Sequence, residues 1–85
     1  MKHSASPDFW AAYRALPADI QSLADRCYRL LAANPSHPSL HCKRIGQLWS
    51  VRVGLHYRAL GANAPDGIVW FWVGTHAEYD KQLRG

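Results

Sequence analysis

The chain has 85 residues, of which 48% are hydrophobic and 12% aromatic. This length supports one small domain over residues 1–85 with a single core, and it excludes a second domain. The formal net charge of +4 favours an acidic partner, either nucleic acid or an acidic protein. We find no apolar run of the about 18 residues that a membrane span needs and no signal peptide, so we expect a cytoplasmic protein without a membrane partner.

The first elements predicted along the chain are two helices. Ser6 is a suitable N-cap, and Pro7 fits the first helical position, where its missing N–H is not needed. Apolar residues recur at helical spacing until Pro17, which ends this helix and starts the next. In the second helix they follow the i, i+3, i+4, i+7 pattern from Ile20 to Leu31, before "NPSHPS" leaves the helical conformation. We therefore expect an αα-hairpin with one shared apolar side.

Beyond this hairpin the apolar period changes to two, which predicts strands. The segment "LHCKRIG" gives a short strand, and "LWSVRV" places Val51 and Val53 on one face and Arg52 on the other. After a turn at Gly54, "HYRAL" returns as a strand, and "GANAPDG" is a loop by its composition. The segment "IVWFWVG" is apolar on both faces, which indicates a central strand covered on both sides.

The order of elements predicts an α+β fold, in which the helical hairpin packs on one face of a three- to four-stranded antiparallel sheet. The polar segment "THAEYDKQLRG" forms a short C-terminal tail or helix from His76 onward. Since the helices must cover one sheet face, we expect Trp49, Val51 and Val53 to point toward them. Arg52 then lies on the opposite face.

The turn between the two middle strands decides where Arg58 points. A two-residue turn sets Arg58 opposite Val51, on the helix side, whereas a three-residue turn sets it opposite Arg52. Like charges directly opposed are unfavourable in an empty sheet. The three-residue turn therefore predicts that something anionic binds at this pair.

Basic residues gather on the sheet face that the helices leave open. Arginine forks match phosphate oxygens bidentately and stay charged at any relevant pH, which suits Arg52 and Arg58 to phosphate binding. Lys43 and Arg44 are further candidates for the RNA backbone, but they are adjacent in a strand, so only one of them can face the site. The alternative for each of these residues is an ordinary solvated position on a sheet.

His76 and Tyr79 follow directly after the predicted central strand and can converge on the same face. A histidine can take or give a proton near neutral pH, and a tyrosine can stack on a base or assist proton transfer. Together with the arginines they provide what RNA cleavage by a 2′-hydroxyl needs without a metal, namely proton transfer and charge stabilisation. Packing and hydrogen-bonding roles remain open alternatives for both residues.

The cysteines and histidines do not predict a metal site. Cys27 and Cys42 lack ligand spacing and are predicted to be small core residues in a reducing cytosol. None of the five histidines is paired at i, i+4 on a predicted helix. We expect neither a metal nor another cofactor.

An αα-hairpin followed in order by "NPSHPSL", "WSVRVGLHYRAL" and "VWFWVGTHAEYD" resembles the RelE/ParE superfamily of toxins from bacterial type II toxin–antitoxin systems. The resemblance extends from about Phe9 to Leu83. It implies a RelE/ParE-like fold, in which any first strand is confined to "KHSA" and is shorter than usual. It also implies an acidic cognate antitoxin that binds the toxin in a hetero-oligomer. In ribosome-dependent members it implies metal-independent cleavage of messenger RNA on the ribosome, which inhibits translation.

This resemblance also implies roles for individual residues. Arg52 retains one of the basic residues that contact the messenger backbone, while Ser50 replaces another. Arg58 matches the arginine that stabilises the cleaved phosphate. His76 occupies a position that is basic in ribosome-dependent members, and Tyr79 matches a tyrosine involved in stacking or proton transfer.

Two other functions remain compatible with the sequence. Ser50 lowers the positive charge of the basic strand. This is compatible with the branch of the superfamily that has the same fold but inhibits DNA gyrase and has no nuclease site. A plain interaction module that binds an acidic partner is the third possibility. Alanine at Arg58 or His76 separates these functions, because only a nuclease loses toxicity while it keeps antitoxin binding.

Overall fold

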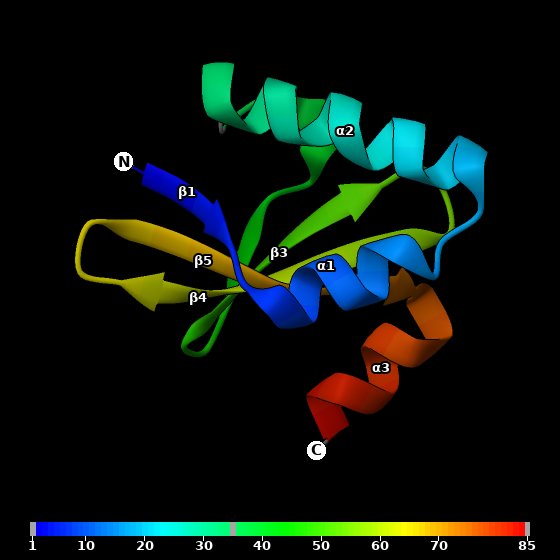
Figure 1. Cartoon of the computed structure of the whole chain (residues 1–85). Helices are drawn as coiled ribbons and strands as arrows, with labels where there is room; N and C mark the ends of the chain where they lie inside the picture. The colour runs from blue at the N-terminus through cyan, green and yellow to red at the C-terminus, as the bar shows by residue number, and fades with distance from the viewer. Residues whose placement is uncertain (1, 35, 85) are drawn as a thin grey trace.

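A five-stranded sheet forms the centre of the molecule and has helices on both of its faces (Figure 1). The structure is a computed structural model and describes residues 2–34 and 36–84. The strands follow the order β1-β5-β4-β3-β2 across the sheet, with bounds β1 (Lys2–Ala5), β2 (Lys43–Ile45), β3 (Leu48–Val53), β4 (Tyr57–Ala64) and β5 (Gly67–Thr75). The helices are α1 (Pro7–Arg14), α2 (Ala18–Ala33), the short 3₁₀-helix η1 (Pro38–Leu40) and α3 (His76–Arg84).

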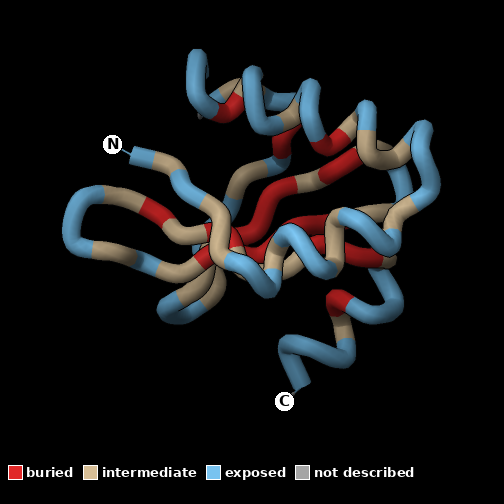
Figure 2. The backbone as a smooth tube through the Cα atoms, viewed as in Figure 1, coloured by how far each residue is buried: buried red, intermediate tan, exposed pale blue. Residues whose placement is uncertain are grey.

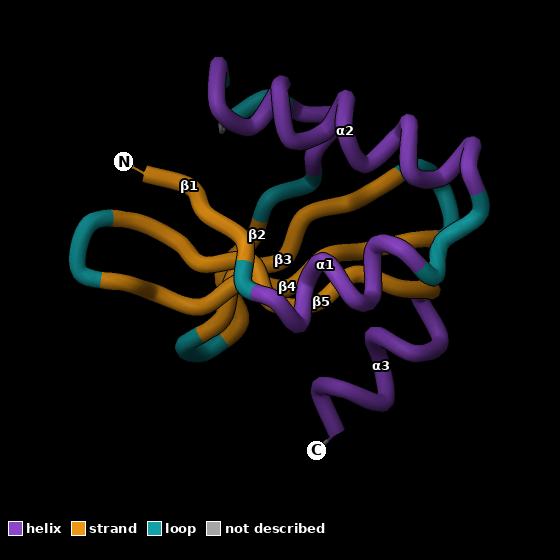
Figure 3. The backbone as a smooth tube through the Cα atoms, viewed as in Figure 1, coloured by secondary structure: helices purple, strands orange, loops and turns teal. Residues whose placement is uncertain are grey.

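The helices α1 and α2 cover one face of the sheet, as the apolar periodicity predicts. Ser6 caps α1, where its Oγ accepts a hydrogen bond from the Phe9 amide at 3.3 Å. The helix α1 lies on β5, and α2 lies on β3 (Figure 3). Their apolar sides enclose a core of buried residues: Ala24, Leu31, Leu40, Val51, Val53, Ala59, Ile68, Trp70 and Val73. Burial is concentrated in the middle of the sheet (Figure 2), and no described helix combines the length and apolar character that crossing a membrane requires.

The sheet is mixed and has five strands, so the prediction of a three- to four-stranded antiparallel sheet is corrected. The additional strand is β1, which pairs in parallel with β5 from Lys2–Gly67 to Ala5–Trp70. The family resemblance confines a first strand to these four residues, "KHSA", whereas they are too few and too polar to show a strand period on their own. A side chain at Gly67 would overlap the carbonyl oxygen of Lys2, so the glycine permits this close approach.

Two predicted boundaries are also corrected. Residues 61–67 were expected to form a loop, yet β4 continues to Ala64 and only Pro65 and Asp66 connect it to β5. Hydrogen bonding to a long neighbouring strand outweighs the loop-like composition here. The strand expected from "LHCKRIG" is confined to β2, because Pro38 begins η1 and His41 has a left-handed backbone with φ of 44°.

The C-terminal segment is the nine-residue helix α3, and it packs against the sheet face opposite α1 and α2. The sequence "THAE" forms a capping box at its start. The Thr75 hydroxyl accepts a hydrogen bond from the Glu78 amide at 3.2 Å, and the Glu78 carboxylate accepts one from the Thr75 amide at 3.0 Å. These reciprocal bonds start the helix directly at the end of β5.

Candidate functional site

The turn between β3 and β4 places two arginines directly opposite each other. Three residues, Gly54 to His56, connect the strands, and Val53 pairs with Tyr57. Arg52 therefore pairs with Arg58. Val51, Val53 and Ala59 lie in the core beneath α1 and α2. Because successive side chains of a strand point to opposite faces of the sheet, Arg52 and Arg58 lie on the other face, which α3 covers.

Arg58 is buried at the centre of this face, with 8% of its surface exposed. Its Nε donates to Ser50 Oγ at 2.9 Å, and its Nη2 donates to the His41 carbonyl oxygen at 3.4 Å. The guanidinium carbon lies 5.1 Å from the centre of the Tyr79 ring, within the range of a cation–π contact. These contacts satisfy part of the hydrogen-bonding capacity of Arg58, but none of them supplies a negative charge.

Arg52 is half-buried and is held by two acceptors. Its Nε donates to the Gly54 carbonyl oxygen at 3.0 Å, and its Nη1 lies 3.1 Å from His41 Nε2. Arginine can only donate, so Nε2 must accept, and this contact requires a neutral His41 imidazole with its proton on Nδ1. Arg52 is thereby fixed beside Arg58 with both charges retained.

No carboxylate contacts either arginine within residues 2–34 and 36–84. The ion pair found in this part of the chain joins His76 Nε2 to Asp80 Oδ1 at 3.8 Å and involves neither guanidinium. Two adjacent cations without a counter-ion are unfavourable, and more so where one of them is buried. The arrangement therefore favours the binding of an anion between β3, β4 and α3.

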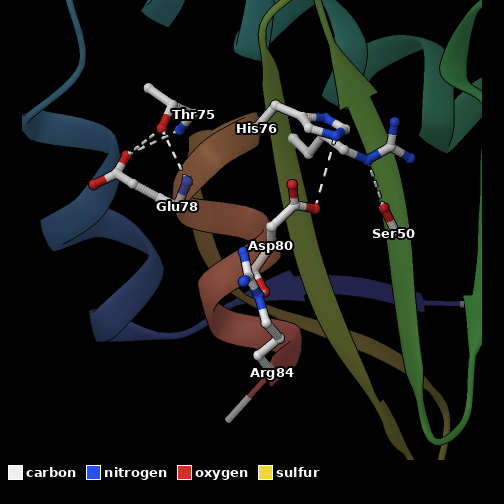
Figure 4. A network of polar contacts seen from close by, with 7 residues as sticks. Ser50, Thr75, His76, Glu78, Asp80 and Arg84 are labelled. Atoms are coloured by element: carbon white, nitrogen blue, oxygen red, sulfur yellow. Dashed lines mark hydrogen bonds and ion pairs between the residues drawn. The ribbon is translucent and has the colours of Figure 1, made fainter.

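The start of α3 brings His76 and Asp80 to the rim of this face, whereas Glu78 turns away from it toward Thr75 (Figure 4). The His76 amide donates to the His56 carbonyl oxygen at 2.8 Å, which ties α3 to the turn that sets the arginine register. The His76 ring is exposed and lies 5.5 Å from the Tyr79 ring, centre to centre. Hydrogen bonds from the Thr75 amide and then from its hydroxyl lower the pKa of Glu78, so this carboxylate is committed to the helix cap.

Tyr79 is the buried residue of α3, with 4% of its surface exposed. Its ring covers Arg58, and its hydroxyl is buried without a hydrogen-bond partner among the described residues. An unpaired buried hydroxyl destabilises a fold by about 1–3 kcal/mol.

The pairing of β2 with β3 separates Lys43 from Arg44. Lys43 pairs with Ser50 and so lies on the same face as the arginine pair. Arg44 pairs with Trp49, and its guanidinium lies 5.6 Å from that ring, on the helix side of the sheet. The structure thus places Lys43 on the same sheet face as Arg52 and Arg58, and it places Arg44 on the other face.

His41 is the residue that the sequence analysis missed. It contacts Arg52 through its ring and Arg58 through its carbonyl oxygen. These contacts depend on the left-handed backbone after η1, and no spacing rule in the sequence marks that conformation. The second proline of "NPSHPSL", which starts η1, is the nearest available signal.

Other chemistry-bearing residues lie away from this face. Cys27 and Cys42 are half-buried against the helix-side core, and burial raises the pKa of both thiols. No group of three or more His, Cys, Asp or Glu side chains within the described residues is arranged to hold a metal ion. A hollow of about 290 Å³ lies between α1, α2, β1 and β5, on the opposite side of the sheet, and its lining is mainly aromatic.

Comparison with known proteins identifies the family. Residues 18–81 match the ParE-like toxin domain. No curated protein matches the sequence. Several solved structures share the fold at low sequence identity. The RelB–RelE antitoxin–toxin complex from Methanococcus jannaschii aligns with a TM-score of 0.73 at 17% identity, over 94% of this chain and 98% of that one.

The YoeB/ParE toxin from Agrobacterium tumefaciens aligns with a TM-score of 0.68 at 14% identity, over 89% of this chain and 99% of that one. The isolated RelE toxin from E. coli aligns with a TM-score of 0.63 at 9% identity, over 96% and 94% of the two chains. These likenesses agree with the observed α+β architecture. The chain belongs to the ParE-like toxin domain family and is a toxin of the RelE/ParE superfamily.

Proposed function

We propose that this toxin cleaves messenger RNA on the ribosome and thereby inhibits translation in the cytoplasm. The observation that carries the proposal is the cross-strand pair Arg52–Arg58, which has no carboxylate partner within the described residues and lies beside His76 and Tyr79. A phosphodiester supplies the negative charge that this pair lacks. The same face offers a proton-transferring side chain, which RNA cleavage also needs.

In the proposed reaction a ribose 2′-hydroxyl attacks the adjacent phosphorus. A bond forms between phosphorus and the 2′-oxygen, and the bond to the 5′-oxygen breaks, leaving a 2′,3′-cyclic phosphate and a 5′-hydroxyl. Arg58 and Arg52 stabilise the charge that develops on the phosphate oxygens. His76, oriented by Asp80 at 3.8 Å, exchanges protons with the reacting oxygens. Tyr79 stacks on a base or assists this transfer, and Lys43 binds the RNA backbone beside the site.

We further propose an acidic antitoxin as the partner that neutralises the toxin in a hetero-oligomeric complex. The net charge of +4 favours such a partner. Two of the structurally similar proteins, from Methanococcus jannaschii and Pyrococcus horikoshii, are RelE toxins in complex with RelB antitoxins. Affinity capture with the purified toxin, followed by a salt titration, tests whether a bound partner is held by charge.

Primer extension on a defined message in a cell-free translation reaction tests the nuclease proposal. We expect new 5′ ends within translated codons when the toxin is present, and none when ribosomes are omitted. The variant Arg58→Ala is expected to abolish these ends while it retains antitoxin binding. An intact message in an otherwise active translation reaction would refute the proposal.

Inhibition of DNA gyrase is the second candidate, and the burial of Arg58 favours it. With 8% of its surface exposed beneath the Tyr79 ring, Arg58 links α3 to β3 and to the loop after η1. A purely structural Arg58 needs no RNA. A supercoiling assay with purified gyrase separates the two functions, because a gyrase inhibitor blocks supercoiling and leaves translated messages intact.

A further inference from the structure

One residue, His41, contacts both members of the arginine pair. Its ring nitrogen Nε2 lies 3.1 Å from Arg52 Nη1, and its carbonyl oxygen lies 3.4 Å from Arg58 Nη2. The Nε atoms of the arginines are bonded elsewhere, to Gly54 and Ser50. Within the described residues this pattern leaves one terminal nitrogen unbonded on each guanidinium, namely Arg52 Nη2 and Arg58 Nη1.

The backbone of His41 is what allows both contacts. Its φ of 44° lies in the left-handed region, and His41 is the one non-glycine residue there within the described chain. Non-glycine residues adopt this conformation in only a few per cent of cases, and such positions cluster at functional sites. The conformation directs the ring toward Arg52 and the carbonyl oxygen toward Arg58, so one residue orients two side chains from different strands.

Fixing these side chains matters because arginine is long and flexible. A free arginine has about 2 kcal/mol of rotamer entropy, and binding a phosphate with a mobile side chain loses that entropy at the moment of binding. Arg52 is half-buried and Arg58 is buried, so both are already ordered before any ligand arrives. A preorganised pair binds its anion more tightly than a mobile pair does.

We propose that His41 is a positioning residue that holds Arg52 and Arg58 as a two-pronged clamp for a single phosphodiester group. The unbonded Nη2 of Arg52 and Nη1 of Arg58 each donate to one non-bridging oxygen of that phosphate. The clamp extends the proposed nuclease function. It rests on that function only for the source of the phosphate, which is then a phosphodiester group of RNA. Binding of a phosphate by the clamp is testable without any RNA.

The variants follow from the two contacts of His41. His41→Gly keeps the left-handed backbone, and with it the carbonyl contact to Arg58, but removes the ring that holds Arg52. His41→Asn does the same with a side chain too short to reach Arg52, and it replaces the glycine variant if that variant does not fold. His41→Gln restores an acceptor near the position of Nε2. His56→Gln is the matched control, because the His56 side chain is exposed and its contact to α3 is made by the backbone.

The first measurement is a titration of the whole protein with inorganic phosphate, followed through the arginine Nε–H signals in NMR spectra. We expect phosphate to shift the signals of Arg52 and Arg58 together in the wild type, in His56→Gln and in His41→Gln. In His41→Gly we expect roughly tenfold weaker phosphate binding, the loss expected for about one charge-assisted hydrogen bond. Equal phosphate binding by the wild type and His41→Gly would overturn the clamp.

The second measurement is the rate of message cleavage on programmed ribosomes at varied ribosome concentration. Because the clamp binds the reacting phosphate, we expect His41→Gly to lower kcat/KM roughly tenfold and His41→Gln to recover most of that loss. An unchanged kcat/KM in His41→Gly, or a loss that His41→Gln does not recover, would overturn the clamp. If the wild type binds phosphate as expected but leaves messages intact, the nuclease proposal is wrong and the clamp stands as a binding site for another phosphate.

Discussion

On the side of the sheet covered by α1 and α2, the buried side chains are apolar and their packing closes the core. On the side covered by α3, the buried side chains include Ser50, Arg58 and Tyr79, and one of them carries a charge without a counter-ion among the described residues. Apolar burial lowers the free energy of the fold directly, whereas buried polar groups do so only when fully paired. The side covered by α1 and α2 therefore supplies most of the stability, whereas the side covered by α3 holds the proposed site and contributes less to stability.

The largest effect on stability is expected from a substitution in the core beneath α1 and α2. Trp70 is 3% exposed, and its indole nitrogen donates to His3 Nδ1 at 3.3 Å. Trp70→Ala leaves a cavity beneath α1 and is expected to lower the free energy of unfolding by about 3–5 kcal/mol, as measured by urea denaturation. Trp10→Ala removes a tryptophan that is 44% exposed, and it is the control with a cost of about 1 kcal/mol or less. Equal costs for the two variants would contradict the placement of the core.

The second prediction compares an arginine on each face of the sheet by its effect on message cleavage. Arg58→Met retains most of the side-chain volume but removes the charge, and we expect message cleavage to fall roughly a hundredfold. The change in the free energy of unfolding is expected to be small, about 1 kcal/mol or less, because removal of the unpaired charge offsets the loss of the hydrogen bond to the buried Ser50 hydroxyl. The control Arg44→Met, on the helix side over Trp49, is expected to lose about 0.5–1 kcal/mol of stability at most and to cut normally. Normal cutting by Arg58→Met would assign this arginine a structural role alone.

The third prediction concerns Tyr79, where we expect a variant that is more stable than the wild type. Tyr79→Phe removes the hydroxyl that is buried without a partner among the described residues, and it keeps the ring that covers Arg58. We expect a gain of about 1 kcal/mol in the free energy of unfolding, measured by urea denaturation. Toxicity in a growth assay is expected to fall at the same time. A destabilised Tyr79→Phe variant would mean that the hydroxyl is hydrogen-bonded in solution.

The smallest effect concerns the start of α3. The folded-state pKa of Glu78 is lowered by the hydrogen bonds from Thr75, so its charge contributes stability above its ordinary value of 4.5. That contribution is lost as the pH falls through the lowered pKa. Glu78→Gln is expected to be less stable by about 0.5 kcal/mol at neutral pH, and its unfolding curve should converge with that of the wild type below pH 4.5. A difference that persists in acid would point to packing instead of charge.

The sequence predicted the elements that carry a strong period and failed where pairing between elements decides the structure. The two helices and the position of Arg52 on the sheet face opposite them follow from local periodicity, and the structure confirms them. The strand over residues 2–5 was indicated by the family resemblance and not by periodicity, because its partner lies more than sixty residues away, at Gly67 to Trp70.

The candidate site was only partly predictable, because pairing between strands decides which side chains share a face. The sequence allowed two registers for Arg58, and the length of one turn selected between them. The separation of Lys43 from Arg44 depends on which of them pairs with Ser50, which no local pattern reveals. His41 escaped notice because its contacts require a left-handed backbone that composition does not encode.

The parallel pairing of β1 with β5 has a consequence for the order in which the molecule folds. The strand β1 and the helix α1 both rest on β5, which is synthesised more than fifty residues after α1. Contacts between segments so far apart in sequence form late, because closing a long loop precedes any gain from pairing. A nascent chain therefore carries β1 and α1 without their partner strand until Gly67 to Thr75 have been made. Because α3 follows β5 in the chain, the arginine pair is likewise covered only after both of its own strands have been synthesised.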